Sequence, residues 1–253
     1  MRILLANDDG IGAEGLDAMV SELAPDHEVI VSAPLSQQSG KSHAMTVHAE
    51  VELLRGEAMM EKYRAYGVEA WAIAGTPVDS VKLYLEAMAK VQPDVVVSGI
   101  NDGSNLATDI LYSGTIGAAR EAFLHRVPAF AVSRDYGSEW SFAEIAHAFH
   151  GFLMETMERR DGECFLYNVN FPKKHNPGPA KFVYGRQGVR DYLNAYNRIE
   201  RDGRIFYAVH GTPYDTDRSE PTDIYATEQG YVSVTPLKVD ATDYEEMERE
   251  LNR

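Results

Sequence analysis

Three polar clusters each follow an apolar run that has the length and composition of a buried strand. Asp8 and Asp9 follow the first run, the segment 36–42 follows the second, and the segment 98–105 follows the third. In an open parallel sheet, ligands bind outside the carboxyl ends of the strands, so segments far apart in the sequence can share one crevice. We therefore expect the three clusters to meet at one edge of a sheet.

The adjacent carboxylates of Asp8 and Asp9 repel each other, and the repulsion is relieved by protonating one of them or by placing a cation between them. Hard divalent ions such as Mg²⁺ and Mn²⁺ prefer oxygen ligands. The hydroxyl of Ser39 and the amide oxygen of Asn101 are ligands of that kind, so the sequence indicates an oxygen cage for one divalent ion. The alternative is a turn or a helix cap, which adjacent Asp residues before glycine often form.

The segment YSGTIGAA supplies a device for holding an anion. Ser113, Gly114 and Thr115 enter an expected helix, where the first backbone N–H groups lack partners within the helix and the macrodipole favours negative charge. A phosphate group fits such a helix start, although a hydroxyl residue there is also an ordinary N-cap. The segment GTPVD at 75–79 has the same two interpretations, and we favour the structural one.

Three histidines and one lysine offer further chemistry. His43 follows Ser39 in the expected crevice loop, where a role in proton transfer or substrate binding is an alternative to a structural role. Lys41 in the same loop either contacts a phosphate or is solvated. His147 and His150 have a helical spacing that suits two metal ligands, but their apolar neighbours favour a packing or surface role.

The composition limits the classes of function. The formal net charge of −15 over 253 residues leaves no basic excess for the phosphate backbone of nucleic acids, so we expect no stable complex with them. No stretch reaches the roughly 18 uninterrupted apolar residues of a membrane helix, and the first residues lack the layout of a signal peptide. We therefore expect no membrane association and a cytoplasmic location. The single cysteine, Cys164, cannot form an intramolecular disulfide.

Strand and helix patterns alternate up to about residue 170, which indicates βαβ units and a mostly parallel sheet covered by helices on both faces. We expect this α/β catalytic core to cover residues 1–172. From about residue 175, segments rich in proline, glycine and tyrosine indicate hairpins or an arm, so residues 173–253 are expected to form an extended region that is not an independent domain. The expected strands are 2–7, 27–34, 93–101, 127–134 and 230–237, with extended structure at 44–54, and the expected helices are 12–24, 75–89, 113–126, 141–160 and 243–251.

The sequence resembles the SurE family, the survival protein E nucleotidases, over nearly the whole chain. The resemblance rests on motifs that occur in the order RILLANDDG, QSGKSHAMT, AGTPVDSV, VVSGINDGSN, YSGTIGAAREA, YNVNFP and TDIYATEQGYVSVTPL. Several of these together are specific, whereas none is specific alone. The resemblance implies a Rossmann-like three-layer α/β sandwich with a C-terminal hairpin arm whose extended elements are exchanged between subunits, in a homodimer or homotetramer.

The same resemblance implies a metal-dependent phosphatase. Its expected reaction is the hydrolysis of nucleoside 5′- and 3′-monophosphates to nucleoside and phosphate, with short-chain polyphosphate as a further substrate. Its expected cofactor is one divalent ion per subunit, Mg²⁺ or Mn²⁺. The residues carried over are Asp8, Asp9, Ser39 and Asn101 as metal ligands, and Asn105, Ser113, Gly114 and Thr115 around the phosphate.

We expect water to attack the phosphomonoester, with one of Asp8 and Asp9 ligating the ion tightly and the other accepting the proton of the water. One alternative makes Asp8 a nucleophile that forms an aspartyl-phosphate. Two others are a Mg²⁺-dependent nucleotide-binding module without turnover and a sugar-nucleotide glycosyltransferase. The tyrosines of the C-terminal region either stack on a nucleobase or, as we favour, make subunit contacts; they are Tyr184, Tyr192, Tyr196, Tyr207 and Tyr214.

Overall fold

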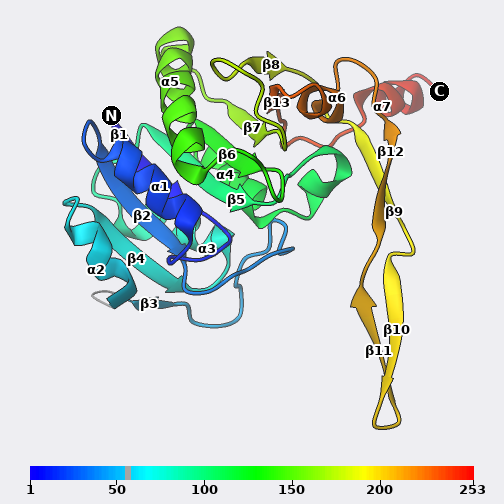
Figure 1. Ribbon diagram of the computed structural model, residues 1–253, viewed down its shortest axis with the longest axis horizontal. Helices are drawn as coiled ribbons and strands as arrows, with labels where there is room; N and C mark the ends of the chain where they lie inside the picture. Colours follow the sequence, from blue (N-terminus) through cyan, green and yellow to red (C-terminus); the bar gives the residue numbers. More distant parts are fainter. Residues whose placement is uncertain (55–57) are drawn as a thin grey trace.

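A nine-stranded sheet forms the centre of the fold (Figure 1). The computed structural model describes residues 1–54 and 58–253. The strands of this sheet are β1 (Arg2–Ala6), β2 (Glu28–Pro34), β3 (Glu52–Leu54), β4 (Glu69–Ala74), β5 (Val95–Asp102), β6 (Ala129–Arg134), β7 (Leu166–Phe171), β8 (Phe182–Tyr184) and β13 (Val232–Pro236). Their order is β3-β4-β2-β1-β5-β6-β7-β13-β8. Neighbouring strands are parallel except in the pairs β3–β4 and β7–β13.

Helices cover both faces of this sheet. They are α1 (Glu14–Leu23), α2 (Ala58–Arg64), α3 (Pro77–Leu83), α4 (Gly114–Leu124) and α5 (Phe142–Arg160), with a π-helical turn η1 (Tyr84–Met88) and a 3-10 turn η2 (Ala107–Leu111). Because successive side chains of a strand point to opposite sides, β1 contributes to two cores. Ile3 and Leu5 pack in the core with α1 and α5, whereas Leu4 and Ala6 pack in the core with α3 and α4. The predicted three-layer α/β fold is thus confirmed.

The chain reverses its direction of travel across the sheet between β1 and β5. β2, β4 and β3 lie on one side of β1, whereas β5 lies on its other side and is followed outward by β6 and β7. The crevice at the carboxyl ends of two such strands is the usual ligand site of an open α/β sheet. Asp8 and Asp9 lie in the turn after β1, and Asn101 lies near the end of β5. The predicted clusters therefore meet where the strand order reverses, which we call the switch point.

Most of the expected elements are found, but the sequence pattern does not reveal β4 and β7. The segment 44–54 is expected to be extended, yet it forms a strand only at its end, in β3. Thr46 explains the difference, because its backbone N–H and its hydroxyl donate to the carboxylate of Asp79 at 2.9 and 2.7 Å. These bonds tie the loop to helix α3 instead of to a neighbouring strand.

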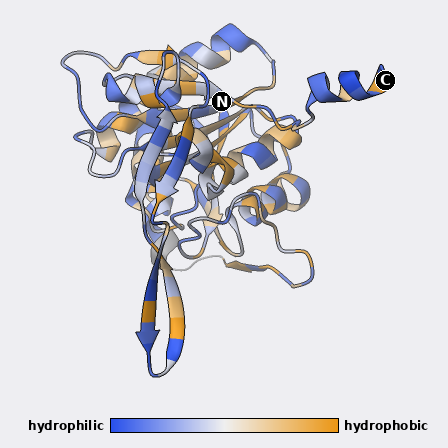
Figure 2. Ribbon diagram, turned by 90° about the vertical axis from the view of Figure 1, so that its right-hand side faces the viewer, coloured by the Kyte–Doolittle hydropathy of each residue, from blue (hydrophilic) through white to orange (hydrophobic). Residues whose placement is uncertain are grey.

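The C-terminal region returns two strands to the sheet and also forms an arm. Between β8 and β13 run β9 (Val189–Leu193), β10 (Tyr196–Arg201), β11 (Arg204–Val209) and β12 (Thr212–Asp217). β9 pairs with β12, and β10 pairs with β11, so the four strands make one long antiparallel ribbon that projects from the core (Figures 1 and 2). Two helices follow, α6 (Asp223–Glu228) and α7 (Tyr244–Leu251).

This region contains the hairpins that the sequence predicts, and its turn at Asp202 and Gly203 has positive φ angles of 51° and 68°, as a tight hairpin turn requires. The division of the chain at residue 172 into two folding regions stays a prediction. None of the helices within the two described ranges combines the length and apolar character needed to cross a membrane.

Candidate functional site

The NDDG turn after β1 is held by the side chain of Asn7. Its Nδ2 donates to the carbonyl of Gly10 at 2.9 Å, and its Oδ1 accepts from the N–H of Gly10 at 3.2 Å. Helix α1 has Ala13 as its N-cap and receives no side-chain cap. The turn therefore uses Asn7 for its own closure, and the carboxylates of Asp8 and Asp9 do not cap the following helix.

Asp8 lies against the N-terminus of helix α4. Its Oδ1 accepts a hydrogen bond of 2.5 Å from the hydroxyl of Thr115, and the side chain is buried. Burial, with the neighbouring charge of Asp9 in addition, raises the pKa of Asp8 to about 6 against the opposing effect of the Thr115 hydrogen bonds. The positive end of the α4 dipole thus lies beside the first acid of the pair.

The loop after β2 is fixed to both β1 and α4. The N–H of Gln38 donates to the carbonyl of Asp8 at 2.7 Å, and the N–H of Ser42 donates to the carbonyl of Tyr112 at 3.0 Å. A Cβ on Gly117 of α4 would lie 2.1 Å from the carbonyl oxygen of Ser42, so glycine is needed where the loop crosses the helix. These contacts hold Ser39, which is itself exposed, over the NDDG turn.

Asn101 is directed by an irregularity near the end of β5. The register between β5 and β6 shifts between Gly99 and Asn101, and such a bulge changes the direction of a side chain. Gly99 has a φ of +137°, and a Cβ there would lie 2.2 Å from the carbonyl oxygen of Val132. The Nδ2 of Asn101 donates to the carbonyl of Gly103 at 2.6 Å, which leaves the harder ligand atom, Oδ1, for a cation.

These segments enclose one cleft of about 320 Å³ at the switch point. Six of the eight residues singled out in the sequence line it, whereas Gly114 and Thr115 are buried behind Ser113. The hydroxyl of Ser113 accepts from the N–H of Ile116 at 3.1 Å, so its own O–H points elsewhere. The cleft is lined by Asp8, Asp9, Gln37, Ser39, Gly40, Asn101, Asp102, Gly103, Ser104, Asn105, Asp109, Tyr112 and Ser113.

Two of the four acids that line the cleft are paired with arginines, and the acid pair Asp8 and Asp9 has no such partner within the two described ranges. Asp102 is paired with Arg134 at 2.8 Å, and Asp109 is paired with Arg190 at 3.1 Å. Among the described residues, neither Asp8 nor Asp9 forms an ion pair with a lysine or arginine. Two carboxylates without a basic partner, a hydroxyl and an amide oxygen form a donor set that fits a hard divalent ion.

That donor set does not depend on histidine or cysteine. Within the part of the chain that the structure describes, no group of three or more His, Cys, Asp or Glu side chains is arranged to hold a metal ion. A metal in the cleft would therefore need the neutral oxygens of Ser39 and Asn101 in addition to the carboxylates. This requirement matches the four ligands that the sequence predicts, whose role as ligands stays a prediction.

Asn105 is positioned by two further asparagines of strand β7. The Nδ2 atoms of Asn168 and Asn170 donate to the carbonyl of Asn105 at 2.8 and 3.1 Å, and the N–H of Asn105 donates to Oδ1 of Asn170 at 2.8 Å. The side chain of Asn105 donates to Ser133 at 2.7 Å and approaches Thr115 at 3.4 Å. Asn105 thus links the β5 loop to the hydroxyl that binds Asp8.

Sequence reasoning did not select several residues that line or support the cleft. Asp109 and Tyr112 belong to the short segment around η2, which carries no periodic pattern. Asn168 and Asn170 did carry a signal, because asparagines that alternate within an apolar strand need buried partners.

The three histidines and the lysine singled out in the sequence are not among the residues that line the cleft. His43 Nε2 lies 2.8 Å from Oε2 of the buried Glu121 on α4, which is a structural contact for the loop. His147 and His150 each place Nδ1 3.1 Å from the same oxygen of Glu22, so these histidines do have an acidic partner, which the sequence did not reveal. In the GTPVD segment, Thr76 and Asp79 form a capping box at the start of α3, which confirms the structural interpretation.

Comparisons with known proteins show which family the chain resembles. Residues 3–194 match the protein family described as survival protein SurE. The chain is 40% identical to the 5′-nucleotidase SurE of Pelotomaculum thermopropionicum, with 98% of this chain and 93% of the relative covered. It is 39% identical to the 5′-nucleotidase SurE of Desulforamulus reducens, with 96% and 95% covered. The crystal structure of the SurE protein from Aquifex aeolicus is similar with a TM-score of 0.82 and 31% identity, and all of both chains is covered.

Proposed function

Because the chain belongs to the SurE family, we propose that its cleft is the active site of a 5′-nucleotidase, a phosphomonoester hydrolase that converts a nucleoside 5′-monophosphate to a nucleoside and phosphate. The observation that carries the proposal is the acid pair Asp8 and Asp9, which has no basic partner among the described residues and lies beside the N-terminus of α4. A cation at the acids and an anion at the helix start are the two components that phosphoryl transfer requires.

We further propose that one divalent ion, Mg²⁺ or Mn²⁺, is held by Asp8, Asp9, Ser39 and Asn101. The donor set supports this ion because all of its ligand atoms are hard oxygens. When bound, such an ion polarises the phosphoryl group and lowers the pKa of a water molecule.

Other groups of the protein bind the phosphate and accept a proton. The hydroxyl of Ser113 accepts a hydrogen bond within its own helix, which leaves its O–H to donate to a phosphate oxygen. The N-terminus of α4 stabilises negative charge that develops on the transferred group. Of the two acids, Asp9 is the more accessible, since Asp8 is 4% exposed and bonded to Thr115, so we assign proton acceptance from the attacking water to Asp9.

The phosphoryl group is the part of the substrate that these residues recognise. We therefore extend the proposal to nucleoside 3′-monophosphates and to short-chain polyphosphate, which present the same group. The cytoplasmic location expected from the sequence stays a prediction.

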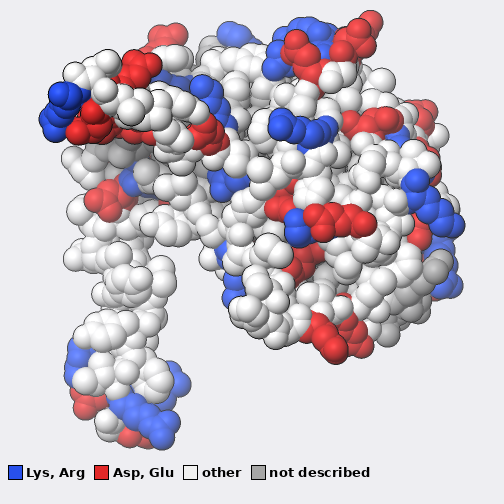
Figure 3. Space-filling view, turned by 180° about the vertical axis from the view of Figure 1, so that it is seen from behind, with Lys and Arg blue, Asp and Glu red and all other residues white. Residues whose placement is uncertain are grey.

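We also propose that the protein is a homodimer or homotetramer joined through the arm. Every residue of β10 and β11 is exposed, and an isolated two-stranded ribbon is marginally stable at best in water. Apolar segments lie along the arm in Figure 2, and Figure 3 shows charged side chains gathered at its tip with a largely uncharged shaft. The large apolar side chains of these two strands are Tyr196, Ile199, Ile205, Phe206, Tyr207 and Val209, each at least 38% exposed. A second subunit would cover this surface.

Metal-stripped protein with ions added back one at a time tests the function. We expect release of inorganic phosphate from AMP and GMP with Mg²⁺ or Mn²⁺ and none without metal, with 3′-AMP and tripolyphosphate as further substrates. Calorimetric titration with Mn²⁺ gives a second readout, in which Asp9→Asn should lose most of the affinity. Tight AMP binding without phosphate release would instead support a non-catalytic nucleotide-binding module.

A further inference from the structure

A second cavity, the arm cavity, lies where strands β9 and β12 of the arm continue into β10 and β11. We propose that it binds the nucleobase of the substrate whose phosphate enters the cleft. This inference rests on the proposed nucleotidase function and extends it. The cavity has a volume of about 580 Å³, within the range of about 300 to 1,000 Å³ that is usual for small-molecule sites. Its lining includes Tyr112, Asp191, Tyr192, Tyr196, Val209 and His210.

The two cavities share one lining residue. Tyr112 lines both the cleft of the acid pair and the cavity at the arm. It directly precedes Ser113, the N-cap of α4, and its side chain is 68% exposed. A phosphate at the helix start would therefore lie one residue away from Tyr112, which also lines the arm cavity.

Tyr192 is held between the same two cavities. It lines the arm cavity, while its hydroxyl donates at 2.8 Å to Oδ2 of Asp109, a residue of the cleft wall. Burial, with the Asp109 carboxylate in addition, raises the pKa of Tyr192 to about 12, so the hydroxyl remains a donor at neutral pH. A lining residue of the arm cavity is therefore bonded to a lining residue of the cleft.

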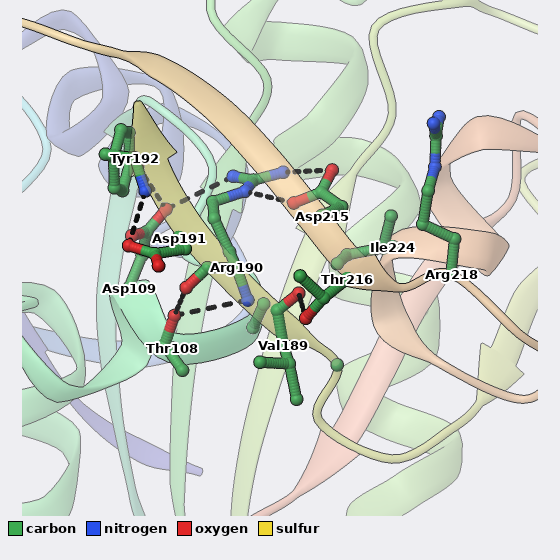
Figure 4. A network of polar contacts seen from close by, with 12 residues as sticks. Thr108, Asp109, Val189, Arg190, Asp191, Tyr192, Asp215, Thr216, Arg218 and Ile224 are labelled. Atoms are coloured by element: carbon green, nitrogen blue, oxygen red, sulfur yellow. Dashed lines mark hydrogen bonds and ion pairs between the residues drawn. The ribbon is translucent and has the colours of Figure 1, made fainter. Parts of the chain in front are cut away.

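Strand β9 of the arm is bonded to η2, which contributes Asp109 to the cleft, as Figure 4 shows. Arg190 places its guanidinium between Asp109 and Asp215, at 3.1 and 2.7 Å. Its backbone carbonyl accepts from the hydroxyl of Thr108, and its N–H donates back to the same hydroxyl oxygen at 3.3 Å. These bonds join β9 to η2, so the position of Tyr192 relative to the phosphate site does not depend on the exposed tip of the arm.

The chemistry of this cavity fits a planar heterocycle. Three tyrosines line the cavity, and every nucleobase can stack on an aromatic ring. The exposed carboxylate of Asp191 and the ring of His210 lie at the same cavity and supply hydrogen-bonding groups for polar edges. The cavity thus suits a nucleoside monophosphate better than a small aliphatic phosphate ester, which would leave these rings unused.

The test compares AMP with ribose 5-phosphate, which keeps the sugar and the phosphate but lacks the base. We expect Tyr112→Ala and Tyr192→Ala each to lower the ratio of kcat/KM for AMP over ribose 5-phosphate by about tenfold, the range expected for loss of one stacking contact. Tyr112→Phe should retain the ratio because it keeps the ring. Tyr136→Ala removes a tyrosine that is 76% exposed and lines neither cavity, so it should retain the ratio as well.

Binding of adenosine, measured by calorimetry, provides a readout that does not depend on turnover. Tyr112→Ala should weaken it by a similar factor, and Tyr136→Ala should not. An unchanged ratio with unchanged adenosine binding overturns the proposal, as does an equal loss for both phosphate esters together with a lower molecular mass, which would identify the cavity as a contact between subunits. If the unaltered protein releases no phosphate from any monophosphate, the proposed function fails, and adenosine binding still decides the base site.

Discussion

The hydroxyl of Thr115 donates a hydrogen bond of 2.5 Å to Oδ1 of Asp8 and so connects the start of α4 to the turn after β1. Both side chains are buried, with Thr115 at 0% and Asp8 at 4% exposure. Thr115 in turn lies 3.4 Å from Nδ2 of Asn105, which β7 holds in place. The direction of the first carboxylate is thus set by a chain of buried polar contacts from two other strands.

Replacing Thr115 by valine removes the hydroxyl at nearly constant volume and frees the carboxylate of Asp8 to rotate. Because groups that orient metal ligands typically contribute about 10- to 100-fold, we expect Thr115→Val to lower kcat/KM for AMP by that factor. Thr115→Ser keeps the hydroxyl and is the matched control, which should retain most of the activity. A loss in Thr115→Ser as large as that in Thr115→Val would contradict a specific role of the hydrogen bond, because the serine hydroxyl can still donate to Asp8.

Asp8→Asn should lower the activity and raise the stability of the protein at neutral pH. In metal-free protein the pKa of Asp8 is about 6, above its ordinary value of 3.8, so folding favours the neutral acid. The stability from this preference is complete below pH 3.8 and is lost as the pH rises to about 6. At pH 7, the free energy of unfolding of Asp8→Asn, measured with urea, should therefore exceed that of the unaltered protein by about 1–3 kcal/mol. Turnover should fall by about 100-fold or more.

The pH dependence provides the control for that comparison. The stability difference between Asp8→Asn and the unaltered protein should shrink when both are unfolded in urea with a chelator at pH 4. A difference that stays constant from pH 4 to pH 7 would contradict the burial of an ionised carboxylate at this position.

Gly117→Ala should displace the loop that carries Ser39. The added Cβ would lie 2.1 Å from the carbonyl oxygen of Ser42, so the loop backbone must move. We expect a loss of about 1–3 kcal/mol in the free energy of unfolding and a weaker affinity for Mn²⁺. Gly151→Ala on α5 has no atom within 4 Å of the new Cβ and should instead stabilise the helix by about 0.5–1 kcal/mol.

Lysines on one face of the arm should dissociate the proposed oligomer. Ile205 and Tyr207 lie on the same side of β11 and are 56% and 64% exposed. We expect the double variant Ile205→Lys with Tyr207→Lys to have a lower mass in light scattering and an unchanged far-ultraviolet spectrum. Val91→Lys, at a surface position outside the arm that is 62% exposed, is the control and should keep the original mass. An unchanged mass in the arm variant would exclude this face from the subunit contact.

The sequence was sufficient to predict the centre of the fold and the acid pair, because both follow from local patterns. The runs before Asp8 and before Asn101 are continuous and apolar, as strands buried on both faces require. A polar cluster at the end of each run then predicts a shared crevice from the geometry of a parallel sheet alone.

The rest of the cleft depends on contacts that no local pattern records. Asp109 belongs to a short 3-10 turn, and its environment is set by Arg190 and Tyr192, which lie far along the chain on the arm. Glu22 likewise meets His147 and His150 only when α1 and α5 pack on the same face. Such pairings are consequences of the tertiary structure, so they became visible only in three dimensions.

The reversal of strand order between β1 and β5 has a consequence for the growing chain. A nascent polypeptide that has not yet extended past residue 94 already contains both acids, yet it lacks Asn101, the strand that pairs with β1 on that side, and helix α4. With the ligands proposed above, the complete cation site can therefore form only after β5 and α4 have been synthesised and β5 has paired with β1. Ion binding by a series of progressively longer fragments would then report when this central strand pair is complete.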